Sequence, residues 1–209
     1  MTGAVMSEFS LVDRIICAAS EAWINDGEVL ATGIGIVPRL AASMSMLTTN
    51  PDLMMTDSEA WLVSEPVPIG PRNGYQIKRE GWMGFTRIFD NVWSGKRHAM
   101  VGPTQVDRFG QANISMIGSD YDKPKSMMLG VRGFPGNSIS HANSFFVPNH
   151  STKVFVAVEV DMVGSGGSNP ARLARGWRLE DNHAFTFTNV QLASIHLVCL
   201  TVVLLLLEK

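Results

Sequence analysis

The sequence predicts an α/β fold in which helices flank a sheet, and two segments carry that prediction. Residues 28–33 form a short apolar strand pattern that ends in a glycine turn, and a helical pattern follows over 38–47. Residues 154–163 are nearly continuous in apolar side chains, which is typical of a strand buried on both faces. Units of strand, glycine turn and helix place their ligands at the carboxyl ends of strands. We therefore expect a ligand site at a strand end.

The composition indicates one globular domain over 1–209 and excludes several classes of partner. Of the 209 residues, 45% are hydrophobic and 17% are charged, and the formal net charge is -2. No bulk field of such a chain attracts nucleic acid or an anionic membrane, so we expect neither as a partner. The two cysteines, Cys17 and Cys199, are far apart and lack metal-ligand spacing. This cysteine usage favours a cytoplasmic protein with no disulfide framework and no metal site.

In the first part of the chain, helical and extended patterns alternate. Apolar residues recur at helical spacing over 10–25, with Ser7 or Ser10 as the N-cap. The strand, glycine turn and helix described above follow, and 53–56 is a second short apolar strand. Proline and glycine then dominate 65–75, which predicts an irregular loop.

Residues 81–95 predict an amphipathic helix with an aromatic apolar side. We expect this side in the core, because aromatic residues at helical spacing within one element favour packing over a base-stacking platform. Seven Lys or Arg but only three Asp or Glu lie between Arg72 and Arg108, an excess that suits either a phosphorylated cofactor or a solvated face. The apolar side consists of Met83, Phe85, Ile88, Phe89 and Trp93.

The second part of the chain has four further strand patterns, over 99–101, 105–107, 144–147 and 154–163. Near the end, 197–207 is an apolar run that is too short to cross a bilayer, since a spanning helix needs about 20 such residues. We expect a buried strand or a subunit contact there, within an atypical or truncated apolar tail over 195–209.

A glycine-rich segment at 130–144 is the strongest local feature. Three glycines and a proline within seven residues predict a turn that no helix or strand passes through. Glycines let backbone N–H groups approach a ligand closely, and a following helix would aim its free amides at the same place. The segment therefore suits an anion or a developing oxyanion, although an ordinary surface loop has the same composition.

Other candidate groups are few. The strand at 53–56 delivers Glu59 to a strand end, where it is either a working carboxylate or a helix cap. No P-loop and no nucleophile elbow is present, and the turn at Gly33 and Gly35 lacks the third glycine of a dinucleotide fingerprint. The five histidines form no ligand-spaced pair, and we expect no serine in a triad setting.

Several motifs, in order, resemble the β subunits of family I coenzyme A transferases. Residues 33–41 are similar to the glycine-isoleucine-glycine-isoleucine-proline turn of that family, and 89–113 follow its long central signature. The segment at 130–144 falls where these enzymes keep a glycine-rich loop that helps to form an oxyanion site beside the thioester. Its Arg-Gly-Phe-Pro-Gly-Asn form is especially similar to the subset that cleaves the last steroid ring in cholesterol-degrading actinobacteria. The resemblance covers roughly 26–163.

The resemblance implies a fold, a partner and a set of site residues. The implied fold is a mixed, mostly parallel sheet flanked by helices, of the NagB/RpiA-like kind. The implied partner is an α subunit, with acyl-CoA bound across the interface and coenzyme A present only as part of the thioester substrate. His141 and Asn143 are expected as polar support. The implied catalytic residues are Glu59, Gly136 and Asn137, and the implied cofactor-binding residues are Gly33, Gly35, Gly130, Arg132 and Gly133.

The residues at 58–61 leave the reaction open between three hypotheses. In the transferases a Ser-Glu-Asn-Gly motif supplies the glutamate that forms a glutamyl-CoA thioester, whereas this chain has Ala60 and the bulky Trp61 after Glu59. Loss of Asn and Gly favours the ring-cleaving subset, in which an acid of the α subunit activates water against a cyclic β-keto acyl-CoA. The alternatives are a true CoA transferase that uses Glu59 and a non-catalytic scaffold or regulatory subunit.

Overall fold

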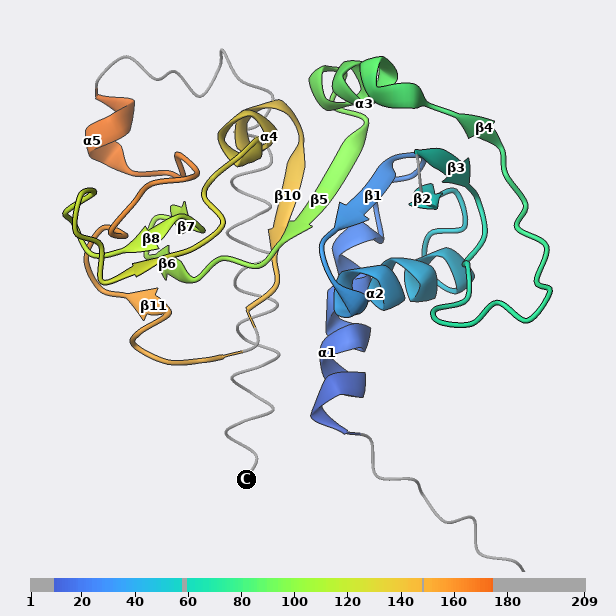
Figure 1. Ribbon diagram of the computed structural model, residues 1–209, viewed down its shortest axis with the longest axis horizontal. Helices are drawn as coiled ribbons and strands as arrows, with labels where there is room; N and C mark the ends of the chain where they lie inside the picture. Colours follow the sequence, from blue (N-terminus) through green and yellow to red (C-terminus); the bar gives the residue numbers. More distant parts are fainter. Residues whose placement is uncertain (1–9, 58–59, 148, 175–209) are drawn as a thin grey trace, which may run out of the picture.

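A three-stranded parallel sheet forms the centre of the molecule in the computed structural model, which describes residues 10–57, 60–147 and 149–174 (Figure 1). The strand order is β1–β5–β10, with β1 at Leu30–Gly33, β5 at Arg97–Val101 and β10 at Ala142–Phe145. Ala31 of β1 and Ala142 of β10 both pair with the same residue of β5. The carboxyl ends of all three strands therefore lie along one edge.

Two helices cover one side of this sheet. Helix α1 (Leu11–Ser20) begins with a capping box between Ser10 and Asp13 and continues as a short 3-10 turn, η1 (Glu21–Trp23). Helix α2 (Ile36–Leu47) follows β1 directly and packs against α1. The core between helices and sheet contains Ala19, Trp23, Ala31, Ala41, Ala42, Met46, Leu53, Met55, Val63, Val67 and Met100.

Short strands and helices extend the fold on both sides of the central sheet (Figure 1). One antiparallel sheet consists of β2 (Met55–Asp57), β3 (Trp61–Val63) and β4 (Gly81–Trp82). On the opposite side lie β6 (Gln105–Asp107), β7 (Ala112–Asn113), β8 (Met116–Ile117), β9 (Ser126–Met127) and β11 (Phe155–Val156). The remaining helices are α3 (Gly84–Trp93), α4 (Phe134–Ser140) and α5 (Pro170–Leu173). The predicted class, a mixed α/β fold with a parallel sheet and flanking helices, is confirmed.

The predicted strand over 154–163 is wrong beyond its first residues. Only β11 is extended, and the exposed fraction of Val158 is 75%. Two acidic residues explain the difference, because Glu159 accepts a hydrogen bond from Gln111 and Asp161 accepts one from Gln105. These side-chain bonds hold the segment as an irregular loop against β6 and β7, where a strand ladder was expected.

Helix α3 forms as predicted, but its aromatic side does not face the core. The exposed fractions of Phe85, Phe89 and Trp93 are 83%, 63% and 71%, whereas Gly84 and Val92 are buried. Helical spacing identifies a face of a helix, but it carries no information about what covers that face. The expectation that this aromatic face packs in the core is therefore wrong.

Among the described residues, no helix is long and apolar enough to cross a membrane. The predicted tail over 195–209, with its apolar run, lies outside the described residues, as do Glu59 and Cys199.

Candidate functional site

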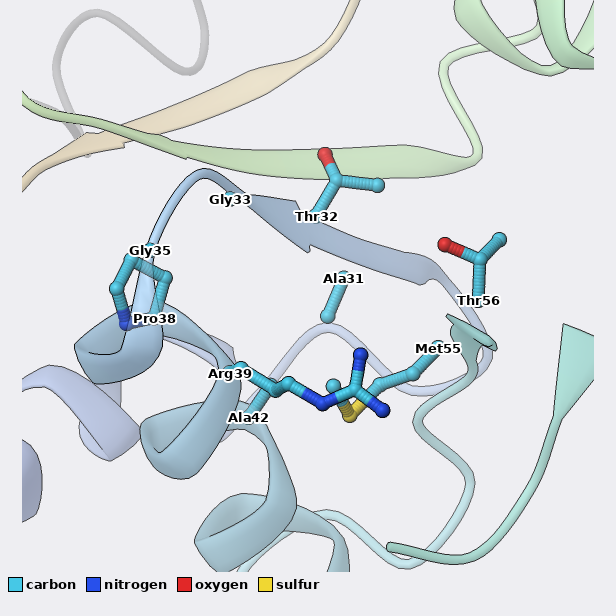
Figure 2. A pocket seen from close by; sticks show the side chains of 9 residues that line it. All are labelled: Ala31, Thr32, Gly33, Gly35, Pro38, Arg39, Ala42, Met55 and Thr56. Carbon is cyan, nitrogen blue, oxygen red and sulfur yellow. The ribbon is translucent and has the colours of Figure 1, made fainter. Parts of the chain in front are cut away.

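A cavity of about 270 Å³ lies between β1, β2 and the first turn of α2 (Figure 2). The side chains of Arg39 and Met55 reach into it from α2 and β2, and Ala31 projects toward them from β1 (Figure 2). The cavity is lined by Ala31, Thr32, Gly33, Gly35, Pro38, Arg39, Ala42, Met55 and Thr56. The glycine turn that follows the first strand thus forms part of a cavity wall, as its place at a strand end predicts.

Gly33 and Gly35 are needed in this turn for different reasons, the first for close packing and the second for its backbone conformation. A Cβ on Gly33 would lie 2.4 Å from the Cβ of Pro38, so only glycine lets the turn pass this close to α2. Gly35 has a φ of 110° and is the N-cap of α2, with no side chain capping the helix. The partial positive charge at the start of α2 therefore lies beside the cavity, which favours an anion there.

An ion-pair cluster borders the cavity. The carboxylate of Asp57, which is 1% exposed, accepts two hydrogen bonds from Arg72, at 3.1 and 2.5 Å, and lies 3.5 Å from Arg39. Burial alone raises the pKa of Asp57, but the hydrogen bonds and charge of Arg72 and the charge of Arg39 outweigh it and hold the pKa below its usual range. Two guanidinium groups thus face the ionised carboxylate of Asp57 beside the cavity.

The segment that follows Asp57 departs from ordinary backbone geometry. Ser58 and Glu59 come next and lie outside the described residues, so the proposed role of Glu59 stays a prediction. Ala60 has a φ of 64°, a conformation that Gly and Asn adopt more readily. Trp61 carries the guanidinium of Arg79 over its ring at 5.1 Å.

The glycine-rich segment at 130–144 contains a helix, so the prediction that no helix passes through it is wrong. Gly133 is the N-cap of α4, and Pro135 lies in the first turn, where proline costs no hydrogen bond. Before the helix, Gly130 and Arg132 have φ values of 84° and 46°. The loop is therefore confined to 130–133.

Hydrogen bonds in α4 decide which amides remain accessible. The N–H of Asn137 donates to the carbonyl of Gly133 at 2.9 Å, so the expectation that this amide faces a ligand is corrected. Within the described part of the chain, no hydrogen bond engages the N–H of Gly133 or of Gly136. A Cβ on either of these two glycines would also meet nothing within 4 Å. Two unoccupied amides thus border open space.

The two glycine segments do not share the described cavity. Its lining includes Gly33 and Gly35 but none of Gly130, Gly133 and Gly136. In the sheet, β5 separates β1, which leads to the first turn, from β10, which follows the second segment. The glycines of the two segments therefore lie at two different places along the sheet.

His141 and Asn143 brace α4 against β10. Asn143 donates from Nδ2 to the carbonyls of Asn137 and His141, at 2.9 and 2.7 Å. The buried His141 ring donates from Nδ1 to the carbonyl of Ala142 at 2.8 Å, and no described residue forms a hydrogen bond with its Nε2. Burial lowers the pKa of His141 to about 4, so the ring is neutral at physiological pH.

A hydrogen-bonded chain with the order of a catalytic triad runs through the core, contrary to the expectation that no serine has such a setting. His98 of β5 lies 2.5 Å from Asp26 through Nδ1 and 2.7 Å from the Ser144 hydroxyl through Nε2. These partners lie 72 and 46 residues away in the sequence, so no spacing motif could reveal them. Ser144 is only 1% exposed, which prevents contact with a substrate. The hydrogen bonds of Asp26, His98 and Ser144 therefore have a structural role: they connect β5 to β10 and to the segment after η1.

No group of three or more metal-ligating side chains occurs in 10–57, 60–147 or 149–174. Cys17 is a free, exposed thiol.

Comparison with solved structures defines the class of fold. The glutaconate CoA-transferase of Acidaminococcus fermentans superposes with a TM-score of 0.64 over 81% of this chain and 68% of that chain, at 20% identity. The IpdAB structure of Rhodococcus jostii RHA1 superposes with a TM-score of 0.71 at 35% identity, over 87% and 68% of the two chains. The fold is therefore that of a CoA-transferase subunit. No model of a protein family matches the chain.

A curated relative identifies the family within this class. The cholesterol ring-cleaving hydrolase IpdB subunit of Mycobacterium tuberculosis H37Rv is 38% identical over 185 residues, which are 88% of this chain and 69% of that protein. The chain belongs to the family of these IpdB subunits. The resemblance to β subunits of family I CoA transferases is thereby confirmed.

Proposed function

We propose that this chain is the β subunit of a two-subunit enzyme that hydrolyses a ring carbon–carbon bond of a cyclic β-keto acyl-CoA in the catabolism of cholesterol or a related steroid. The observation that carries the proposal is the 38% identity to an IpdB subunit over 88% of the chain. An α subunit completes the active site and supplies the acid that activates water. The free, exposed Cys17 supports a cytoplasmic location.

The proposed ring hydrolysis needs hydrogen-bond donors, and the backbone amides of Gly133 and Gly136 are suited to this role. Water adds to the ring ketone, the bond between the ketone carbon and the α-carbon breaks, and its electron pair moves onto the thioester as an enolate. A proton then returns to the α-carbon. Backbone N–H groups that point at the thioester oxygen stabilise this enolate. Gly133 and Gly136 are proposed for that role because, within the described residues, no hydrogen bond engages their amides and a Cβ on either would meet no atom within 4 Å.

The anionic part of coenzyme A needs cationic partners, and we assign two groups to it. Arg132 is exposed, has no ion-pair partner in the described residues, and holds a left-handed φ of 46° beside Gly130. Such a conformation costs a non-glycine residue about 1–2 kcal/mol, so retaining arginine there is consistent with a use for its charge. The positive start of α2 at Gly33 and Gly35, next to Arg39, is the second group.

A true CoA transferase is the second candidate, and the sequence after β2 favours it. Glu59 follows Asp57, which borders the cavity, by two positions, and in the resemblance to the transferases it takes the place of the nucleophile. In this alternative, the Glu59 carboxylate attacks the thioester carbonyl and expels the coenzyme A thiolate, which leaves a mixed anhydride. The thiolate then attacks the Glu59 carbonyl, which forms a glutamyl-CoA thioester and releases the substrate acyl group as a carboxylate.

Co-expression with an IpdA-type α subunit and assay of the complex on a cyclic β-keto acyl-CoA tests the proposal. We expect ring opening, and we expect Gly136→Val to lower kcat at least 100-fold, because the branched side chain keeps the thioester oxygen away from the amide and so has the effect of a lost oxyanion donor. Ser138→Ala, on the same helix, is the matched control and should retain activity. Absence of ring opening by a folded complex would contradict the proposal.

Glu59→Gln separates the two reactions. Ring hydrolysis by the α-subunit acid does not need a nucleophile at this position, so we expect the variant complex to retain turnover. In a transferase, the wild-type complex yields a borohydride-trapped glutamyl adduct and the variant loses both adduct and turnover.

A further inference from the structure

Helix α3 presents an aromatic face to solvent. Phe85, Phe89 and Trp93 are spaced by four residues and therefore share one side of the helix, here called the aromatic strip. Their exposed fractions are 83%, 63% and 71%. A single exposed aromatic residue needs no explanation, but three in a row on one helix form a continuous apolar surface.

The strip is held outward by the way α3 attaches to the molecule. Gly84 and Val92 are buried and Ile88 is half-buried, and these three residues define a side of the helix that points about 100° away from the middle of the strip. The ring of Trp82 lies so close to Gly84 that a Cβ there would be 3.0 Å from a ring atom. Rotating the helix to bury the strip would bring this buried side out to solvent, so the exposure follows from the way α3 is attached.

The exposed area matches what a subunit interface needs. A whole aromatic side chain covers roughly 150–250 Å², so the three exposed fractions leave on the order of 400 Å² uncovered. A stable protein–protein interface takes about 800 Å² from each partner, with aromatic residues at its centre. The strip therefore supplies about half of one partner's share, and the exposed side chains of Thr86 and Asp90 flank it with polar groups.

The strip also adjoins the helix that carries the proposed oxyanion amides. Helices α3 and α4 are in contact, and a Cβ on Gly95 would lie 3.7 Å from the carbonyl of Ser140 at the end of α4. In Figure 1 both helices lie at the same end of the strands β5 and β10. A protein that covers the strip is thus placed next to α4.

We propose that the aromatic strip is a docking surface for the α subunit. The inference rests on the proposed function, which requires an α subunit near α4, and it adds the surface that binds this subunit. IpdB subunits belong to a two-subunit hydrolase whose solved form is IpdAB. The partner is expected to present an apolar surface to Phe89, the central residue of the strip, with polar groups that face Thr86 and Asp90.

The test is co-purification of this chain with an affinity-tagged IpdA-type α subunit of its source organism. Phe89→Glu should lower the affinity for the α subunit at least 30-fold, as expected for a central interface residue. Tyr121→Glu is the matched control, since Tyr121 is 67% exposed and lies outside the strip, and it should bind as the wild type does. Thermal unfolding of each isolated variant should stay close to that of the wild type, because both side chains are exposed.

The outcomes separate the inference from the proposed function. If the wild-type chain and the α subunit do not associate, the proposed function fails, and this inference fails with it. If they associate and Phe89→Glu binds equally well, the function stands and the docking surface is overturned. If the wild-type chain alone is a dimer by light scattering, and Phe89→Glu abolishes that dimer but not α-subunit binding, the strip binds a second copy and the inference is likewise overturned.

Discussion

Gly33 lies just before the first turn of α2 and Gly136 lies within the first turn of α4, and the surroundings of these two glycines differ. A Cβ on Gly33 would come within 2.4 Å of Pro38, whereas a Cβ on Gly136 would meet nothing within 4 Å. The fold itself therefore requires glycine at 33, because strand and helix approach too closely for any side chain. At 136 the fold sets no such requirement, so a demand for glycine there must come from something that approaches from outside.

Alanine substitutions at Gly33 and Gly136 test whether the fold requires glycine at the first position but not at the second. Gly33→Ala should destabilise the chain by about 3 kcal/mol, at the upper end for overpacking, because Pro38 is fixed within α2. Gly136→Ala should change stability by less than about 1 kcal/mol, in the stabilising direction, since alanine is the better helix former. Urea unfolding of both variants measures the two effects. Equal destabilisation by the two substitutions would contradict the distinction.

The polar support of α4 predicts that stability depends on pH between pH 7 and pH 4.5. The buried ring of His141 has a pKa of about 4, whereas in the unfolded chain it titrates near 6.5. Between these values the unfolded state binds more protons, so stability falls as pH decreases through this window. From pH 7 to pH 4.5 the loss should be about 2 kcal/mol, measured by denaturant unfolding at each pH.

His141→Asn provides the control for this pH effect. Asparagine keeps a donor for the carbonyl of Ala142 but does not titrate, so the variant should lose about 2 kcal/mol less than the wild type over the same pH range. Identical slopes for the two proteins would show that other groups cause the acid sensitivity.

A smaller change in stability is expected at Ala60, in the segment that follows β2. Ala60 holds a φ of 64°, so Ala60→Gly should relieve strain and raise stability by about 0.5 kcal/mol, after allowance for the greater freedom of glycine in the unfolded chain. Ala171→Gly, in α5, should instead lower stability by up to about 1 kcal/mol. Thermal unfolding compares the pair, and a loss in both variants would show that the conformation at 60 is not strained.

The sequence predicted the parts of the fold that depend on local signals. The helix over 38–47, the strand at 28–33 and the glycine turn between them were all recoverable, because glycine and proline act within a few residues. The helix after Gly133 was missed because the same two residue types also mark turns. Only the surrounding structure shows that Pro135 occupies a first helical turn.

Properties that depend on distant partners were out of reach. The hydrogen bonds that link Asp26, His98 and Ser144 join three segments that share no sequence motif. The strand expected over 154–163 does not form beyond β11, because Glu159 and Asp161 make hydrogen bonds with residues far away in the sequence. The exposure of Phe89 likewise depends on which side of α3 meets the rest of the molecule, and a periodic pattern does not specify this.

The order of strands in the central sheet also constrains how the chain is made. Arg97 of β5 bonds to Thr32 of β1 across 65 residues, and His98 bonds to Ser144 of β10 across 46. A ribosome adds about 5–20 residues per second, so β1 waits roughly 3–13 seconds before its partner β5 has been synthesised, and β10 follows later. During that interval the edge of β1 has no partner in the parallel sheet, and the helices α1 and α2 are available to cover one face of the strand. The pace of translation is therefore expected to influence how much of the chain reaches its native fold.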